Sequence, residues 1–208
     1  MHIVELKFKM MKKNNFVIMV FGAFCILVWT TSCSNSQKSG ENNTTTQADS
    51  HENLVKRGEY LVAIMGCNDC HSPKKMGPNG PEVIPELLLS GYPSDRPIIK
   101  FDNPMIKQGF GMFYPDLTAA AGPWGVSFAG NLTPDQTGIG TWTEEQFKKA
   151  LTQGKFKGLD GTRMLLPPMP WEGFSNLTDN DVSAIFAYLK SLKPVKNVVP
   201  AAIALGDM

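Results

Sequence analysis

The stretch that decides the fold is Cys67-Asn68-Asp69-Cys70-His71. Two cysteines in the spacing C-x-x-C, followed directly by histidine, are the attachment motif of c-type haem. Two thiols at this spacing reach the two vinyl groups of one porphyrin, and the adjacent imidazole lies under the iron. The motif therefore predicts one covalent haem c, attached through Cys67 and Cys70, with His71 as the proximal iron ligand.

Two other chemistries also use paired cysteines. A thioredoxin-like redox pair would follow a strand, whereas residues 58–66 have a helical pattern. A zinc site would need two further Cys or His ligands, but after residue 33 the chain holds only His51 outside the motif. Haem attachment is the interpretation that the residues favour.

The sixth iron ligand has to come from elsewhere in the chain. Because His51 lies in a polar segment, a His/Met pair is the economical axial set, and such ligation raises the reduction potential. Met169 is the preferred ligand because Pro167, Pro168 and Pro170 hold the chain around it extended. Met164 is the next choice. The downstream candidates are Met76, Met105, Met112, Met164, Met169 and Met208.

The first 32 residues have the pattern of an export signal. Four lysines precede an uncharged run, residues 16–29, whose 14 residues span roughly 21 Å as a helix, short of a ~30 Å hydrocarbon core. The run leads to Thr30-Thr31-Ser32-Cys33, which resembles a lipoprotein processing site. We expect Cys33 to carry a lipid that anchors the exported protein to a membrane; an ordinary cleaved signal and an uncleaved anchor are the alternatives.

Residues 33–50 are predicted to be a disordered tether, because residues 34–50 contain no apolar side chain except Ala48 and so cannot bury a core. The predicted folded domain follows at residues 51–200, and residues 201–208 are expected to be a C-terminal tail.

The charge balance excludes one large class of proteins. The whole chain has 20 basic and 19 acidic residues; residues 1–32 remove four Lys and one Glu, which leaves 16 and 18 and a net charge of −2. A strongly basic nucleic-acid-binding surface is therefore not expected.

Three helices are predicted from apolar periodicity and end signals. The first covers residues 53–65 and contains Gly58, which we expect to permit a close crossing with the last helix near Tyr188. The second begins after Thr143 with a capping box to Gln146 and ends at Gly154. The third begins after Thr178 and stops before Pro194. From His71 to Pro134 there are ten prolines and little periodicity, which predicts a long loop wrapped around the haem.

The chain resembles bacterial single-haem c-type cytochromes of the class I fold, in the branch related to cytochrome subunits of periplasmic dehydrogenases. The resemblance rests on CNDCHSPKKMGPNGPE (67–82), GPWGVSFAGNLTPDQTGIGTWTEEQF (122–147) and MLLPPMPWEGFSNLTDNDVSAIFAYLKSLKPVKN (164–197). It implies an all-α fold and His71 and Met169 as axial ligands. Subunits of that branch often carry several haems, whereas this chain has one motif.

The resemblance also implies that Asn131, Trp142 and Arg163 border the haem propionates. Each has a plainer interpretation from its sequence context. Asn131 would serve as a turn residue in Asn-Leu-Thr-Pro, Trp142 as a core residue, and Arg163 as a solvated surface charge.

A haem iron with two protein ligands has no open position for substrate, and no second histidine is placed to act as a distal base. The predicted function is therefore one-electron transfer by a periplasmic, membrane-tethered carrier rather than catalysis. The alternatives are an electron-entry subunit of a membrane dehydrogenase or oxidase and, less favoured, a haem peroxidase or sensor. Redox partners would dock transiently at the haem edge, with help from two lysine groups: Lys74 and Lys75, and Lys148, Lys149, Lys155 and Lys157.

Overall fold

The structure is a computed structural model that describes residues 43–98, 100, 101 and 103–208. The predicted export signal, the predicted lipidation site Cys33 and the first part of the predicted tether lie outside these residues. The described helices are α1 (Asn43–Ile64), α2 (Cys67–His71), α3 (Asn103–Lys107), α4 (Glu144–Gln153) and α5 (Asp179–Ser191). Among them, none has both the length and the apolar character needed to cross a bilayer.

Helix α1 begins ten residues earlier than predicted. Its first eight residues, 43–50, fall within the segment that was expected to be disordered. Their polar composition gives no apolar stripe, so periodicity could not place them in a helix. The predicted C-terminal half is as expected: Leu61 and Val62 are buried in the core.

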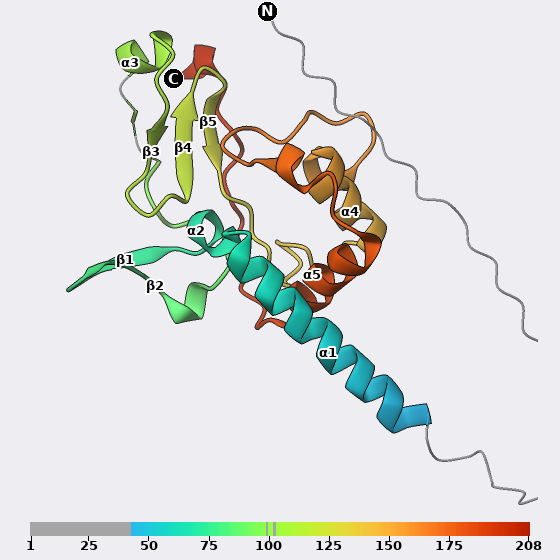
Figure 1. Ribbon diagram of the computed structural model, residues 1–208. Coiled ribbons are helices and arrows are strands. Elements are labelled where there is room, and N and C mark those ends of the chain that lie inside the picture. Colours follow the sequence, from blue (N-terminus) through green and yellow to red (C-terminus); the bar gives the residue numbers. More distant parts are fainter. Residues whose placement is uncertain (1–42, 99, 102) are drawn as a thin grey trace, which may run out of the picture. The chain divides into compact units, whose positions relative to one another are not determined.

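The crossing between α1 and α5 depends on Gly58, as predicted. A Cβ atom at this position would lie 1.9 Å from the carbonyl oxygen of Ala184 and 2.7 Å from the Cβ of Tyr188. Only a residue without a side chain allows two helix backbones to approach so closely. This contact joins the N-terminal helix to the C-terminal helix (Figure 1).

The ends of α4 and α5 follow the capping signals in the sequence. Thr143 and Gln146 form both hydrogen bonds of a capping box at the start of α4, and Gly154 ends that helix in the left-handed conformation with φ 65°. The Thr178 side chain accepts a hydrogen bond from the Asp181 backbone N–H at the start of α5. Each side chain satisfies a backbone donor that the first turn of a helix leaves unpaired.

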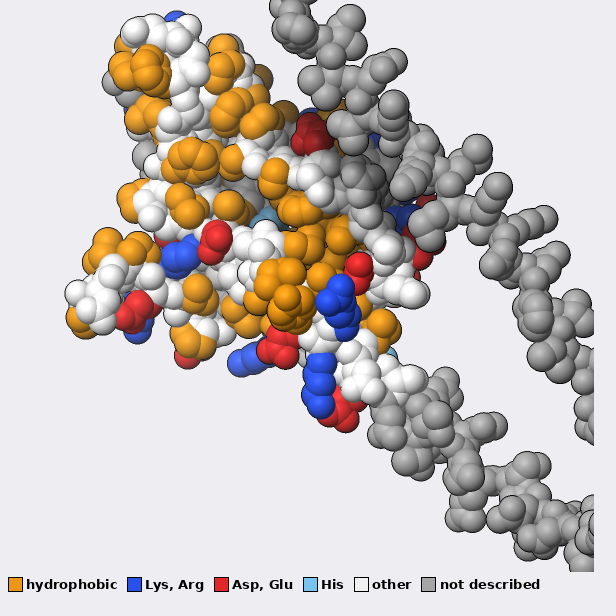
Figure 2. All heavy atoms as spheres, in the orientation of Figure 1, with side chains coloured by type: hydrophobic (Ala, Val, Ile, Leu, Met, Phe, Trp, Pro, Cys, Tyr) orange, Lys and Arg blue, Asp and Glu red, His pale blue; other side chains and the backbone are white. Residues whose placement is uncertain are grey.

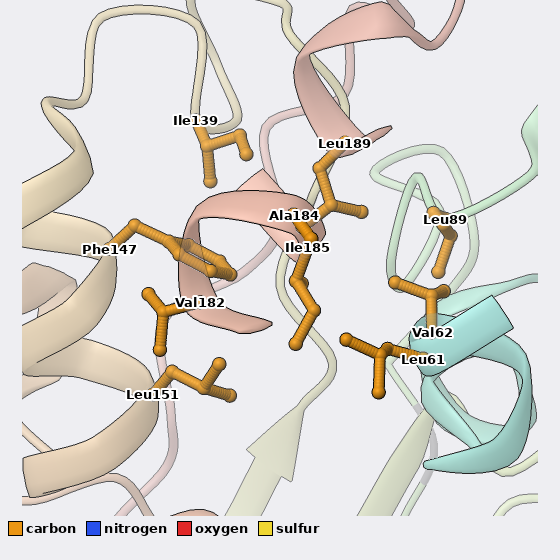
Figure 3. Packing of buried hydrophobic residues seen from close by; sticks show 10 residues of the cluster. All are labelled: Leu61, Val62, Leu89, Ile139, Phe147, Leu151, Val182, Ala184, Ile185 and Leu189. Carbon is orange, nitrogen blue, oxygen red and sulfur yellow. The ribbon is translucent and has the colours of Figure 1, made fainter. Parts of the chain in front are cut away.

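The main core lies between these helices, and α5 is its centre. Figure 3 shows Phe147 and Leu151 of α4 on one side of Val182, and Leu61 of α1 on the opposite side, near Ile185. Helix α5 therefore buries two faces, which explains its broad apolar stripe. The main core consists of Leu61, Val62, Leu89, Ile139, Phe147, Leu151, Val182, Ala184, Ile185 and Leu189.

The long segment that was predicted to lack regular structure contains two small antiparallel sheets, so the fold is not purely α-helical. One is a hairpin of β1 (Lys74–Gly77) and β2 (Gly80–Val83). The other has the order β3 (Met112–Phe113), β4 (Ala119–Gly122) and β5 (Gly125–Phe128). Every residue of β4 is buried, so the strand shows no alternation of polar and apolar side chains from which it could be predicted.

The C-terminal segment packs against this second sheet. Ile203 and Val126 exchange backbone hydrogen bonds of 2.8 and 3.0 Å, and Ile203 and Leu205 cover a small core of Ile106, Ala121 and Val126. Residues 201–208 are thus part of the folded unit rather than a free tail. Their docking covers the outer edge of β5, an edge that would otherwise expose unpaired backbone groups.

Candidate haem site

The haem-attachment motif forms its own short helix, α2. Gly66, in the left-handed conformation with φ 68°, turns the chain from α1 into this helix. The Ser72 backbone N–H donates to the Asn68 carbonyl at the far end, and the Ser72 hydroxyl donates to the Asn68 side chain. The turn and the cap place Cys67, Cys70 and His71 on one rigid segment.

Both motif cysteines are free thiols and half-buried. Burial raises the pKa of Cys67 to about 11 and also raises that of Cys70. A dithiol redox pair needs the opposite shift, because the thiolate is the reactive form. The surroundings of the two thiols therefore do not favour the thioredoxin-like alternative.

His71 is fixed in the orientation that an iron ligand requires. Its Nδ1 atom lies 2.8 Å from the carbonyl oxygen of Gly130. Since a carbonyl can only accept, Nδ1 carries the proton and Nε2 keeps its lone pair. Burial lowers the pKa of His71, which also favours the neutral, metal-binding form.

The Gly130 carbonyl is positioned by two backbone hydrogen bonds from Gly91 and Tyr92, which we call the bracket around His71. Gly91 donates its backbone N–H to the His71 carbonyl at 2.8 Å, and Tyr92 donates to the Ala129 carbonyl at 2.9 Å. Gly91 has φ 79°, and a Cβ there would lie 2.4 Å from the Ala129 oxygen. This close approach needs glycine, so the sequence at position 91 serves the placement of His71.

Met169 lies on a segment that we call the methionine strap, residues 164–170. The strap is attached to the end of α4 by a 2.7 Å hydrogen bond from the Leu165 N–H to the Gly154 carbonyl. Met169 is half-buried and packs against the main core, which Cys67 also contacts. Met164, the second candidate, is 38% exposed. These surroundings support Met169 over Met164, and the ligand assignment stays a prediction.

The chemistry of these groups fits haem c. The described residues supply two thiols at the attachment spacing, a neutral imidazole with Nε2 unprotonated, and a thioether on a proline-flanked strap. Figure 2 shows hydrophobic side chains gathered over the middle of one face, between the second sheet and α1. A porphyrin requires such apolar surroundings.

Asn131, Trp142 and Arg163 have protein contacts that match their plainer interpretations. The buried Asn131 side chain donates to the Val195 carbonyl at 2.8 Å and accepts from the Thr133 N–H at 2.9 Å. Trp142 packs against the main core. The exposed Arg163 guanidinium lies 3.9 Å from the centre of the Phe156 ring. Contact with haem propionates stays a prediction for all three.

Three of the six lysines expected to help docking, Lys74, Lys148 and Lys149, are engaged within the protein. The Lys74 ammonium donates to the carbonyls of Asp69, Ser72 and Asp116 at 2.6, 3.2 and 2.9 Å. Lys148 and Lys149 form ion pairs with Asp179 and Asp160. Lys74 therefore clamps the end of α2 to a distant loop, a role that its place in the sequence did not indicate.

The chain belongs to the cytochrome c family. The family model described as Cytochrome c matches residues 55–193, which include α2, the bracket around His71 and the methionine strap. Membership of this family implies covalently bound haem c, and the function of the family is electron transfer. The predicted class of protein is thus confirmed, although the small sheets make its secondary structure mixed.

Three of the similar proteins are cytochrome subunits of dehydrogenases. The chain is 32% identical over 152 residues to the fructose dehydrogenase cytochrome subunit of Gluconobacter japonicus, covering 72% of this chain and 24% of that protein. It is 31% identical to the quinone alcohol dehydrogenase cytochrome c subunit of Gluconobacter oxydans strain 621H, covering 71% and 23%. The gluconate 2-dehydrogenase cytochrome c subunit of Pantoea cypripedii is also 31% identical, covering 74% and 25%. The chain spans about a quarter of the length of these relatives.

Proposed function

We propose that the chain is an exported, membrane-tethered one-electron carrier whose haem c is held by Cys67, Cys70, His71 and Met169. The observation that carries this proposal is the 2.8 Å hydrogen bond from His71 to the Gly130 carbonyl. It orients an imidazole, directly after the cysteine pair, with Nε2 ready for a metal. Haem c, when bound, supplies an iron redox couple that takes up and releases one electron.

The protein's own residues limit that site to electron transfer. His71 and Met169 would take both axial positions, so that no position remains for oxygen or peroxide. Rigid attachment of α2, through the Gly66 turn and the Lys74 clamp, would keep the site's geometry the same in both redox states. A small geometric change between the states is what fast electron transfer needs.

The export signal and the lipid on Cys33 complete the proposal. They are supported by the sequence pattern of residues 1–33 and by the chemistry of haem attachment, which fits an exported protein. Residues 33–42, ahead of α1, would then connect the membrane to the folded domain.

The second candidate function is an electron-entry subunit in a membrane dehydrogenase complex. The relatives favour it, because three of them at 31–32% identity are cytochrome subunits of dehydrogenases. The two functions share one site and differ in the lifetime of the contact with the partner. Purification from detergent-solubilised membranes discriminates them: a stable stoichiometric complex supports the subunit, and a single chain supports the shuttle.

The site itself is tested by absorption spectra of the ferric holoprotein. Methionine sulfur on ferric haem gives a weak far-red charge-transfer band, which we expect in the wild type. Met169→Ala should abolish the band, while Met164→Ala, the matched control on the same strap, should keep it. Loss of the band in Met164→Ala alone would reassign the ligand, and a colourless protein would refute the haem site.

The third alternative, a peroxidase or sensor, is tested on the same samples. Carbon monoxide added to the reduced wild type at neutral pH should leave the spectrum unchanged if Met169 stays bound. Rapid carbon monoxide binding would favour an enzyme or sensor.

A further inference from the structure

The second sheet and the methionine strap are joined by one side chain. Ser127 lies on β5, paired with Ala120 of β4, and its hydroxyl lies 2.6 Å from the carbonyl oxygen of Pro167. The two residues are 40 positions apart in the chain. In Figure 1 the segment drawn in orange, which leads out of α4, passes beside β5.

The direction of this hydrogen bond follows from its geometry. The Ser127 oxygen also lies 3.3 Å from the Ala120 carbonyl. A hydroxyl has one proton to donate, and the shorter contact is the stronger hydrogen bond. The proton therefore points to Pro167, two residues before Met169.

The methionine strap has few backbone N–H donors that could hold it in place. Pro167, Pro168 and Pro170 have no backbone N–H, and the Met169 N–H donates within the strap, to the Leu166 carbonyl at 3.3 Å. Pro167 and Pro168 are exposed, so burial does not hold them in place. Besides the Leu165 hydrogen bond to Gly154 and the packing of Met169 on the main core, a donor from a neighbouring element can fix the strap at Pro167.

We propose that Ser127 is a positioning residue for the distal ligand: its hydroxyl holds the strap so that the Met169 sulfur stays on the iron. The inference rests on the proposed function, in which Met169 is that ligand. It assigns a role to the second sheet, which is to hold the strap at a point other than its hydrogen bond to the end of α4. The iron–thioether bond is weak, so its occupancy depends on how firmly the chain presents the sulfur.

The test is a titration of the ferric holoprotein with imidazole, which competes with Met169 for one coordination position. The apparent affinity for imidazole rises with the fraction of molecules in which the sulfur has left the iron. Ser127→Ala removes one hydrogen bond, which should increase this fraction about fivefold. The apparent affinity for imidazole should rise by the same factor. The far-red band should weaken in the same variant.

A second pair of variants isolates the hydroxyl. Thr and Val are both β-branched, have similar volumes and suit a strand, but only Thr can donate to Pro167. We expect Ser127→Thr to bind imidazole like the wild type and Ser127→Val to bind it like Ser127→Ala. Ser191→Ala is the control, because the Ser191 hydroxyl also donates to a carbonyl, that of Tyr188 at 2.7 Å, away from the strap.

Each outcome decides one point. Unchanged imidazole affinity in Ser127→Ala, or an equal rise in Ser191→Ala, would overturn the bracing role. So would a Thr variant that behaves like the Val variant. The ligand assignment is judged separately: if Met169→Ala keeps the far-red band, the proposed axial pair fails and the inference with it. If Met169→Ala loses the far-red band while Ser127→Ala binds imidazole like the wild type, only the inference about Ser127 fails.

Discussion

Replacing Gly58 by alanine sets two effects of opposite sign against each other. Alanine is the better helix former, by about 1 kcal/mol, so an unpacked α1 would gain stability. The added Cβ, however, would lie 1.9 Å from the Ala184 carbonyl oxygen. That oxygen belongs to the backbone of α5 and cannot rotate away, so the two helices would have to separate.

The sizes of these effects predict a net loss. Overpacking usually costs about 1–3 kcal/mol, and a clash between a side chain and a helix backbone belongs at the upper end of that range. Subtracting the gain in helix propensity leaves a destabilisation of about 2 kcal/mol. For a domain of this size the melting temperature should fall by about 4–8 °C.

Urea unfolding of the holoprotein measures the effect. We expect the midpoint of Gly58→Ala to fall while the slope of the transition stays the same. Gly173→Ala is the matched control, because no atom beyond the adjacent residues lies within 4 Å of a Cβ at that position. A Gly58→Ala protein as stable as the wild type would show that the α1–α5 crossing is not tight, which would refute the reasoning.

Two further predictions concern buried polar groups. Burial alone would raise the pKa of Asp116, but hydrogen bonds from Arg96 and Thr118 hold that pKa below its ordinary value of 3.8. The ion pair between Arg96 and Asp116 therefore stabilises the fold above about pH 4. This stabilisation is lost as the pH falls through the lowered pKa. Arg96→Met should therefore destabilise the protein by about 3 kcal/mol at pH 7. In thermal melts, the difference in stability between variant and wild type should shrink below pH 4. A difference that stays constant with pH would contradict the prediction. Asn131→Ala should cost about 2 kcal/mol, because the buried Thr133 N–H loses its acceptor at 2.9 Å. Equal urea midpoints for variant and wild type would rule this out. Redox titration of Asn131→Ala should show an unchanged potential if Asn131 acts only as a turn residue, and a shifted one if it contacts a propionate.

The sequence predicted those parts of the fold that depend on neighbours in the chain. The capping box at Thr143 and the stop at Gly154 are local signals, because the groups they satisfy lie within one helical turn. The crossing at Gly58 could also be predicted, since a glycine inside an apolar helical stripe has a cost that a close contact explains. A helix over residues 43–50 could not be predicted, because Ala48 is the single apolar side chain among them and gives no apolar stripe.

The second sheet could not be predicted for a different reason. Its central strand contains Ala119, Ala120 and Ala121, all buried, so that both faces are apolar and the period of two disappears. The strand is stabilised by partners on both sides and by the C-terminal segment around Ile203. These contacts join positions up to about 80 residues apart, which no local pattern records.

The cysteine pair followed by histidine is the attachment motif of c-type haem, so the sequence alone determined the class of chemistry and predicted the proximal ligand. What only the tertiary structure decided is how these groups are held. The acceptor for His71 is the backbone carbonyl of Gly130, and a carbonyl is the same in every residue, so the identity of the side chain carries no signal for it. The same holds for the carbonyls that bind Lys74 and for the Pro167 oxygen that accepts from Ser127: they become partners only when the folded chain brings distant segments together.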